Sequence, residues 1–208
     1  MVGEKPKPSE RMAIETLDVN IVVRARQGDR EAFRLLFEAT KGRTFNYMLR
    51  MIRNVEDAKD LTQEVYAKAF FALPGLRQPE AFYGWLKALV VNRVRDYLRS
   101  APARNREVSL EEMVETSGGD VSALGVAAVT PEEDLLARER SAEMEKAIDG
   151  LPDIHREVVL LHHIEGLPVE HIASLLRVPP GTVKSRLARA RGELASKLSS
   201  YTGLKGGS

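Results

Sequence analysis

The 208-residue chain contains no cysteine, which excludes both a disulfide framework and thiolate ligation of zinc. It has no run approaching the ~20 apolar residues that a membrane-spanning helix needs. Residues 1–20 are charged and contain proline, without the apolar core of a signal peptide. We therefore expect a cytosolic protein that does not insert into a membrane.

Excess charge is also lacking, since the net charge is only +1, and this argues against a protein coated with positive charge. The basic residues are instead concentrated in one stretch. Between Arg177 and Lys197 there are six basic residues and a single acid, Glu193. Such a local excess indicates one particular surface for an anionic partner.

The stretch Pro180–Leu194 predicts an amphipathic helix, separated from what precedes it by Pro180 and Gly181 and capped by Thr182. Its apolar positions recur at helical spacing and are Val183, Leu187, Ala190 and Leu194. The opposite face carries Lys184, Ser185, Ala188, Arg189 and Arg191. One face of this helix is therefore expected to pack on a core while the other meets the partner.

A short apolar helix ending at Arg177 comes directly before, and Val178-Pro-Pro-Gly181 forms a tight turn between the two. Ala173 is small enough to let the helices cross closely. This layout predicts a helix-turn-helix, whose second helix enters the DNA major groove. A helical hairpin with a solvated basic face is the alternative.

In the N-terminal half, apolar periodicity begins at Asp18, stops at Gln27-Gly-Asp29, and resumes in a helix capped by Asp29 and in a further segment, Thr44–Ile52. Asn54 then caps a helix that runs to Phe71. One side of that helix carries a polar strip made of Asp57, Asp60, Gln63 and Glu64. The strip is available to a partner, although matching of the helix dipole and a solvated face would also explain its acids.

A proline-rich and glycine-containing loop, residues 73–80, leads into a helix over residues 82–99 with mainly core apolar positions. Around that core lie aromatic, amide and basic side chains: Tyr83, Trp85, Lys87, Asn92, Arg93, Arg95 and Arg99. Aromatic rings interleaved with basic groups hold unstacked bases of single strands. Core aromatics with solvated arginines would give the same pattern, and the helix alone favours that interpretation.

Residues 107–134 contain eight acids and no Lys or Arg, with Ser117-Gly-Gly-Asp120 in the middle, which is typical of a linker. Thr130-Pro-Glu-Glu133 then predicts a capped helix start, and Asp153 is the predicted cap of the following helix. The predicted fold is all-α, with two small helical domains joined by an acidic flexible linker, the second containing the helix-turn-helix. The boundaries are a tail over 1–17, a first domain over 18–100, the linker over 101–130, a second domain over 131–200 and a tail over 201–208.

The four histidines are His155, His162, His163 and His171, and they have neither HExxH spacing nor cysteines beside them. We interpret them as surface or satisfied helical histidines. No catalytic residue, metal site or cofactor is expected.

Several motifs occur together in one order along the chain. They are Asp57-Ala-Lys-Asp-Leu-Thr-Gln-Glu-Val65 with Ala67 to Phe70, Phe82-Tyr-Gly-Trp-Leu-Lys87, Asn92 with Asp96-Tyr-Leu-Arg99, Leu151-Pro152 with Arg156-Glu-Val158, and Gly181-Thr-Val-Lys-Ser-Arg186 with Arg189-Ala-Arg191. As a set, spanning residues 20–198, they resemble the bacterial sigma factors of the extracytoplasmic-function group. The resemblance implies a protein that joins core RNA polymerase, directs it to promoters and helps to open the DNA.

The resemblance also implies roles for the surfaces. The strip of Asp57, Asp60, Gln63 and Glu64 would dock on the coiled coil of the polymerase clamp, and the second domain would meet the flap. The loop over residues 73–81 and the helix after it would capture the −10 strand, through the region of Tyr83, Trp85, Lys87, Asn92, Arg93 and Arg95. The acidic linker would thread the polymerase channel, and an anti-sigma protein commonly covers such surfaces.

The helix-turn-helix would read the −35 element of promoter DNA. The residues in register for base and phosphate contacts are Thr182, Lys184, Ser185, Arg186, Ala188, Arg189 and Arg191. Lys184 stands where some members have Arg, and Lys does not make the two-pronged contact to guanine. Ala188 is small where an aromatic residue sometimes occurs, which suggests contact with a thymine methyl group or none.

A stand-alone helix-turn-helix regulator with a helical sensor domain is the alternative function. It would need a dimer to read paired half-sites. A monomer without autonomous operator binding would exclude it.

Overall fold

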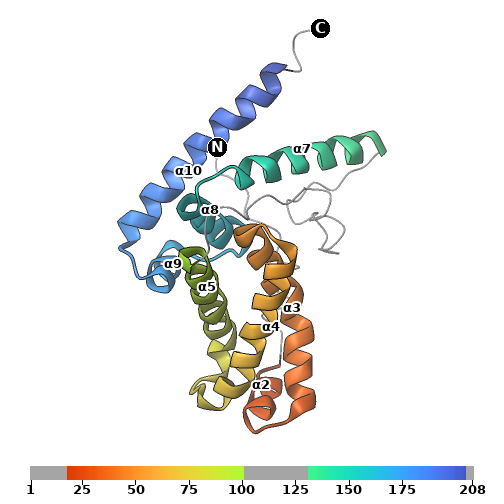
Figure 1. Cartoon of the computed structure of the whole chain (residues 1–208), viewed down its shortest axis with the longest axis vertical. Coiled ribbons are helices and arrows are strands. Elements are labelled where there is room, and N and C mark those ends of the chain that lie inside the picture. The colour runs from red at the N-terminus through yellow and green to blue at the C-terminus, as the bar shows by residue number, and fades with distance from the viewer. Residues whose placement is uncertain (1–17, 101–130, 205–208) are drawn as a thin grey trace. The chain divides into compact units, whose positions relative to one another are not determined.

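The computed structural model describes residues 18–100 and 131–204, and every regular element in those two ranges is helical (Figure 1). The chain divides into two compact units, of which the first holds the helices before residue 101 and the second holds those after residue 130. The predicted all-α chain with two helical domains is thereby confirmed. The predicted linker over 101–130 and the tail over 1–17 lie outside the described residues.

Helix α2 (Val19–Arg26) and helix α3 (Arg30–Ile52) open the first unit. Gly28 lies between them with a φ of +93°, a left-handed conformation that glycine adopts without a Cβ clash. Our prediction of a separate helix over Thr44–Ile52 is wrong, since α3 runs unbroken through Gly42. One glycine in a helix interior costs about 1 kcal/mol relative to alanine, and the buried turns on both sides of it offset that cost.

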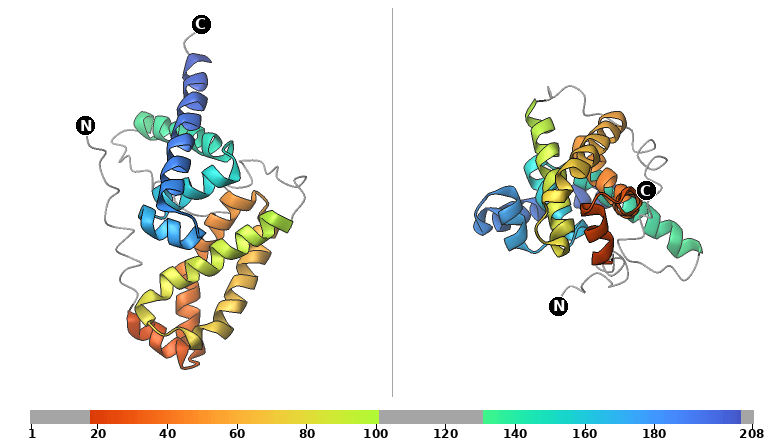
Figure 2. Two further views of the ribbon diagram at one scale, coloured as in Figure 1. Left: turned by 90° about the vertical axis from the view of Figure 1, so that its left-hand side faces the viewer. Right: turned by 90° about the horizontal axis from the view of Figure 1, so that it is seen from below.

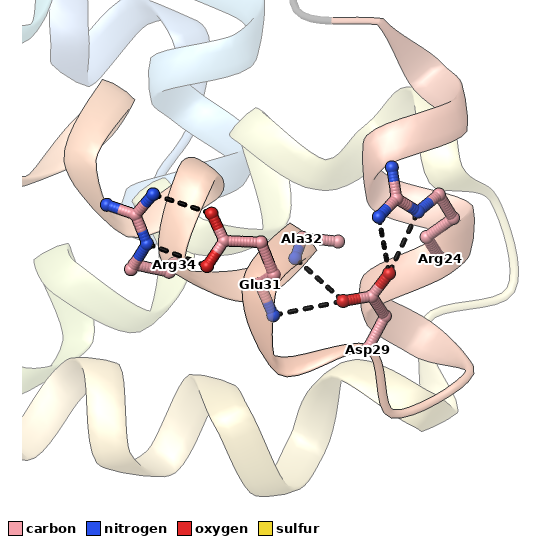
Figure 3. A network of polar contacts seen from close by, with 5 residues as sticks. All are labelled: Arg24, Asp29, Glu31, Ala32 and Arg34. Atoms are coloured by element: carbon pink, nitrogen blue, oxygen red, sulfur yellow. Dashed lines mark hydrogen bonds and ion pairs between the residues drawn. The ribbon is translucent and has the colours of Figure 1, made fainter.

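The predicted cap at Asp29 is confirmed and forms the centre of a polar network (Figure 3). Its carboxylate accepts hydrogen bonds from the backbone N–H groups of Ala32 and Glu31, both at 3.0 Å. The Arg24 guanidinium donates to the same carboxylate at 2.6 and 2.9 Å. The Ala32 amide and the Arg24 side chain hold the pKa of Asp29 below its ordinary value. This network fixes the turn between α2 and α3.

Helix α4 (Val55–Ala72) and helix α5 (Phe82–Ser100) complete the first unit, and both pack against α3 (Figure 2). Asn54 caps α4 as predicted, with its side chain accepting from the Asp57 N–H at 3.0 Å. The predicted loop between the helices contains two short 3-10 turns, η1 (Leu73–Gly75) and η2 (Pro79–Ala81). The loop is therefore anchored at both ends before it enters α5.

The second unit consists of α7 (Pro131–Asp149), α8 (Asp153–Val159), a π-helical segment η4 (Leu160–Ile164), α9 (Val169–Leu176) and α10 (Pro180–Leu204). Helix α10 packs against both α8 and α9, as Figure 1 and the left view of Figure 2 show. It extends four residues past the end that we predicted for the domain, to Leu204.

Two predicted caps are wrong. Asp153 is the first residue of α8, and Pro152 occupies the cap position without a side-chain hydrogen bond. Thr182 lies inside α10, which already begins at Pro180. Proline suits the first helical position because it lacks an N–H that would have no partner there. The predicted cap at Thr130 and its partner Glu133 lie outside the residues whose side chains are described.

A buried arginine joins α7 to α8. Arg156 is 2% exposed and donates to the backbone oxygens of Leu151 at 2.6 Å and Asp149 at 2.9 Å. It also reaches Ile148 O at 3.4 Å and the Asp153 carboxylate at 3.3 Å. These bonds satisfy carbonyl groups at the end of α7 that have no partner within their own helix.

Candidate nucleic-acid interface

The turn before α10 sets the direction in which that helix leaves α9. Arg177 adopts a left-handed conformation with a φ of 55° and ends α9. The backbone N–H groups of Thr182 and Val183 then donate to the Pro179 oxygen at 2.9 and 3.3 Å. Ala173, at 5% exposure, lies buried in α9 as we predicted for the crossing of two helices. The backbone thus forms the predicted helix-turn-helix.

The inner face of α10 is apolar and closely packed. Val183 and Ala190 are fully buried and Leu187 is 7% exposed, while Leu194 is half-buried. These residues are the four that the helical spacing predicted. Their burial leaves the opposite face of α10 to the solvent.

The outer face of α10 carries the side chains that we predicted for DNA. Those that are exposed are Lys184, Ser185, Ala188, Arg189 and Arg191. Thr182 and Arg186 are half-buried, and the Ser185 hydroxyl donates to the Thr182 oxygen at 3.0 Å. At about 100° per residue, Ser185 and Ala188 lie at the centre of this face. The centre of the outer face of α10 therefore carries small, exposed side chains.

Basic side chains flank that centre on both sides. By the same helical geometry, Lys184 and Arg191 share one flank, and Arg186 and Arg189 share the other. The DNA major groove has one phosphate backbone on each side. Two pairs of cations around a small-residue centre match that geometry.

In the first unit, the predicted polar strip on α4 is only partly free. Asp60, Gln63 and Glu64 are exposed, but Asp57 is half-buried and accepts a hydrogen bond from the Tyr97 hydroxyl of α5 at 2.5 Å. The structure thus separates the strip into three outward residues and one that ties α4 to α5.

Sequence reasoning missed an exposed aromatic residue next to this strip. Phe71 is 80% exposed at the end of α4, and its ring meets Phe70 edge-on at 5.5 Å. Asp60, Glu64 and Phe71 lie four and seven residues apart, which places them on one face of the helix. Extending the acidic strip by this spacing would have found Phe71.

The residues that we predicted on α5 for single-stranded DNA do not form one surface. Trp85, Asn92 and Arg95 lie on the outward side of the helix, where Asn92 is exposed and the other two are half-buried. Lys87 instead points at α3, where its ammonium group lies 5.2 Å from the centre of the Tyr47 ring. Arg93 points at α4 and donates from Nε to Glu64 Oε2 at 2.7 Å.

Tyr83 is directed inward as well. Its ring meets Phe82 at 5.5 Å, and its hydroxyl is buried without a hydrogen-bond partner among the described residues. Burial disfavours the charged phenolate and raises the pKa of Tyr83 to about 12. The Tyr83 hydroxyl therefore belongs to the interior, whereas Trp85, which is also half-buried, lies on the outward side of the helix.

The histidines are mostly engaged within the second unit. His155 is 7% exposed, and its Nδ1 lies 2.8 Å from Glu193 Oε1, which joins α8 to α10. His162 Nδ1 lies 2.9 Å from the Leu167 oxygen. Within the described residues, no three His, Asp or Glu side chains gather as they would around a metal ion.

Across residues 18–100 and 131–204, each helix is too short or too polar to cross a bilayer.

The chain combines an all-α unit with a second unit that contains a helix-turn-helix, the layout expected of a transcription initiation factor of the sigma type. Two family models match in the same order: Sigma-70 region 2 over residues 36–104, and Sigma-70, region 4 over residues 141–194. The chain belongs to the extracytoplasmic-function (ECF) group of the sigma-70 family. It is an alternative sigma factor that binds RNA polymerase.

Curated relatives match over nearly their whole length. The RNA polymerase sigma-H factor of Pseudomonas aeruginosa is 32% identical, covering 86% of this chain and 93% of the relative. The ECF RNA polymerase sigma-E factor of Haemophilus influenzae is 32% identical, covering 90% and 98%, and that of Escherichia coli K12 is 31% identical, covering 90% and 97%.

Two solved structures share the fold at 22% identity. One is CnrH in complex with the cytosolic domain of CnrY, with a TM-score of 0.59, covering 88% of this chain and 97% of that chain. The other is the sigma factor RpoE in complex with the anti-sigma factor NepR from Bartonella quintana, with a TM-score of 0.55, covering 80% and 96%.

Proposed function

We propose that this sigma factor reads the −35 promoter element through α10. The observation that carries the proposal is the outer face of that helix, with small side chains at its centre and a pair of cations on each flank. Arg189 lies nearest the centre of the four cations and is assigned a base contact, because its planar guanidinium can bond guanine with two hydrogen bonds. Arg186 and Arg191, on opposite flanks, are assigned to phosphates.

The remaining residues of this face have finer roles in the proposal. Lys184 contributes a point charge without the planar fork of arginine. Ala188 leaves room for a thymine methyl group, and Ser185 offers a hydroxyl oxygen. Thr182 is half-buried and contributes to a phosphate contact at the start of the helix.

The first unit is proposed to dock on the clamp coiled coil of the polymerase through the strip on α4, while the second unit meets the flap. Asp60, Gln63 and Glu64 are exposed and suited to direct contact, and Phe71 adds an apolar end to the same face. Asp57 supports the strip through its bond to Tyr97. A charged strip that ends in an exposed aromatic ring fits a protein partner better than solvent.

The −10 strand is proposed to bind where the η1–η2 loop meets α5, and its capture would promote melting of the DNA. Trp85 offers a half-buried ring on the outward side of α5 for stacking, and Asn92 and Arg95 line the same side beyond it. Lys87 and Arg93 join this surface only after leaving Tyr47 and Glu64. Tyr83 supports the loop from the core side.

The proposal places the protein in the cytoplasm, where it acts as an initiation factor and not as an enzyme. The solved structure from Bartonella quintana is a complex with an anti-sigma factor. We propose a partner of that kind here, covering the surfaces on α4 and α10, and a regulon that responds to stress or to envelope damage. The acidic linker over 101–130 would occupy the polymerase channel.

In-vitro transcription with core polymerase on a pool of bacterial promoter fragments tests the function. Specific transcripts that depend on this protein are expected, and their upstream DNA would supply the −10 and −35 sequences. Tight binding of the protein alone to a palindromic site, without transcripts, would contradict the proposal.

The polymerase face is tested separately by the binding of core polymerase. The double variant D60A/E64A and the single variant F71A should each weaken binding by about tenfold, as expected for contacts near the middle of an interface. E38A on α3 is the matched control, since Glu38 is also an exposed acid paired within its own helix to Lys41. Unchanged affinity of D60A/E64A would contradict the assignment of this face.

A further inference from the structure

A small pocket in the second unit lies beside the DNA-reading helix. It is lined by residues from η4, from the start of α9 and from α10: His162, His163, Val169, Lys184, Leu187 and Arg191. The two imidazole rings meet edge-on at 4.8 Å. The apolar side chains form part of the wall, and the polar groups are two imidazoles, an ammonium and a guanidinium. No carboxylate is among the lining residues.

Hydrogen bonding sets what His162 can offer. A carbonyl oxygen accepts only, so the 2.9 Å contact between His162 Nδ1 and the Leu167 oxygen places a proton on Nδ1. His162 Nε2 then accepts in the neutral ring and donates in the charged one. The ring is thereby held in a fixed orientation within the lining of the pocket.

His163 stands among groups that oppose its protonation. Desolvation, the neighbouring His162 and the Arg191 guanidinium all lower the pKa of His163. Lys184 adds a further positive charge from α10, and Val169 of α9 contributes no charge. An anion in the pocket would instead favour protonation of His163. It would face three cationic groups, Lys184, Arg191 and the protonated His163, and a fourth when His162 is charged.

The place of the pocket indicates which anion reaches it. Lys184 and Arg191 lie on one flank of α10, next to the centre that we propose for the major groove. A helix in the major groove has a phosphate backbone along that flank. The pocket therefore lies where a DNA phosphate passes.

We propose that the pocket of His162, His163, Lys184 and Arg191 binds a backbone phosphate of promoter DNA, and that His163 takes up a proton as the DNA binds. This inference rests on the proposed role of α10. It adds two histidines to the DNA contacts and makes promoter affinity depend on pH. Affinity rises as the pH falls, because binding consumes a proton, and one proton allows at most a tenfold change per pH unit.

The test uses holoenzyme and a promoter fragment recovered by the transcription experiment. Promoter dissociation constants are measured at pH 6 and pH 8 over a salt series, for wild type, His163→Gln and the control His171→Gln. His171 is exposed on α9 and is not among the lining residues. At pH 6, the slope of log K against log salt should be smaller by about 0.9 for His163→Gln than for wild type, corresponding to one phosphate contact. At pH 8 the two slopes should coincide.

Equal slopes of wild type and His163→Gln at pH 6, or an equal loss in His171→Gln, would overturn the inference. Failure of all transcription would instead contradict the proposed function itself. A second measurement follows the His163 ring resonances of the full chain with duplex DNA and with millimolar inorganic phosphate. A shift with phosphate and none with DNA would assign the pocket to a free anion and overturn the DNA contact.

Discussion

Arg93 on α5 donates a hydrogen bond from Nε to Glu64 Oε2 on α4, across 2.7 Å. The arginine belongs to the set proposed for the −10 strand, and the glutamate belongs to the strip proposed for the polymerase clamp. Their side chains are 33% and 55% exposed, so the pair contributes at most about 1 kcal/mol to stability. In the proposed roles, each of the two residues must leave the pair before it can contact its own ligand.

Glu64→Gln should release Arg93 toward DNA. Without core polymerase, the affinity of the Glu64→Gln protein for a single-stranded oligonucleotide with the −10 sequence is expected to rise a few-fold when Arg93 is present. It should stay unchanged in an Arg93→Gln background. A double-mutant cycle of the dissociation constants for that oligonucleotide measures this coupling. The same effect of Glu64→Gln in both backgrounds would show that Arg93 does not leave the pair.

Tyr66→Phe should destabilise the first unit by about 1–2 kcal/mol. The Tyr66 hydroxyl is buried and lies 2.7 Å from Thr40 Oγ1 and 3.1 Å from Thr44 Oγ1, so its removal leaves two buried hydroxyls short of a partner. Urea unfolding followed by the fluorescence of Trp85, the single tryptophan, measures the change.

Tyr83→Phe is the matched comparison. The Tyr83 hydroxyl is buried without a hydrogen-bond partner in the described part of the chain, so losing it should leave stability unchanged or raise it. Because the pKa of Tyr83 is raised to about 12, the unfolded chain loses this proton first as pH rises above 10. Wild type should therefore lose stability relative to Tyr83→Phe between pH 10 and 12. Equal destabilisation by both Phe variants at neutral pH would contradict this account.

Arg156→Ala should destabilise the second unit by about 3 kcal/mol, because several carbonyl groups at the end of α7 and in the following turn lose a buried charged donor. Lysine lacks the fork that reaches several oxygens, so Arg156→Lys should recover little. In urea unfolding, the helical signal in circular dichroism should show a transition at lower urea concentration than in wild type. The midpoint of the Trp85 fluorescence transition, which reports the first unit, should stay unchanged. Arg189→Ala, on the exposed face of α10, is the control and should leave both transitions in place.

Arg189→Ala should weaken binding to the cognate promoter by about 1–3 kcal/mol and change mixed-sequence DNA much less, as expected for a base contact. Arg186→Ala should weaken binding to both DNAs equally. It should also reduce the slope of log K against log salt by about 0.9. Holoenzyme binding measurements on the two DNAs separate these outcomes. Equal loss on every sequence for Arg189→Ala would reassign it to a phosphate.

The sequence predicted local structure well where a short-range rule applies. Asp29 and Asn54 were found because a capping side chain acts within three residues. Asp153 and Thr182 were misassigned as caps because a proline precedes each of them. Pro152 already occupies the cap position of α8, and Pro180 already begins α10. The continuity of α3 through Gly42 could not be predicted, since it depends on burial against distant helices.

Side-chain direction on α5 was the larger gap in the predicted site. Periodicity places Lys87 and Arg93 at the edge of the core, but it does not show which residue of a neighbouring helix each side chain contacts. Lys87 contacts Tyr47, 40 positions away in the sequence, and Arg93 contacts Glu64, 29 positions away. Phe71, in contrast, was within reach of the spacing rule applied to the acidic strip.

The π-helical segment Leu160–Ile164 has an evolutionary consequence. A π-turn holds one residue more than an α-turn, so it is equivalent to a one-residue insertion in an otherwise regular helix. Removing one residue there would restore the α register and rotate the following side chains by about 100°. His162 and His163 both lie in this segment. A single-codon insertion or deletion can therefore create or erase the phosphate pocket while the sequence of α10 stays untouched.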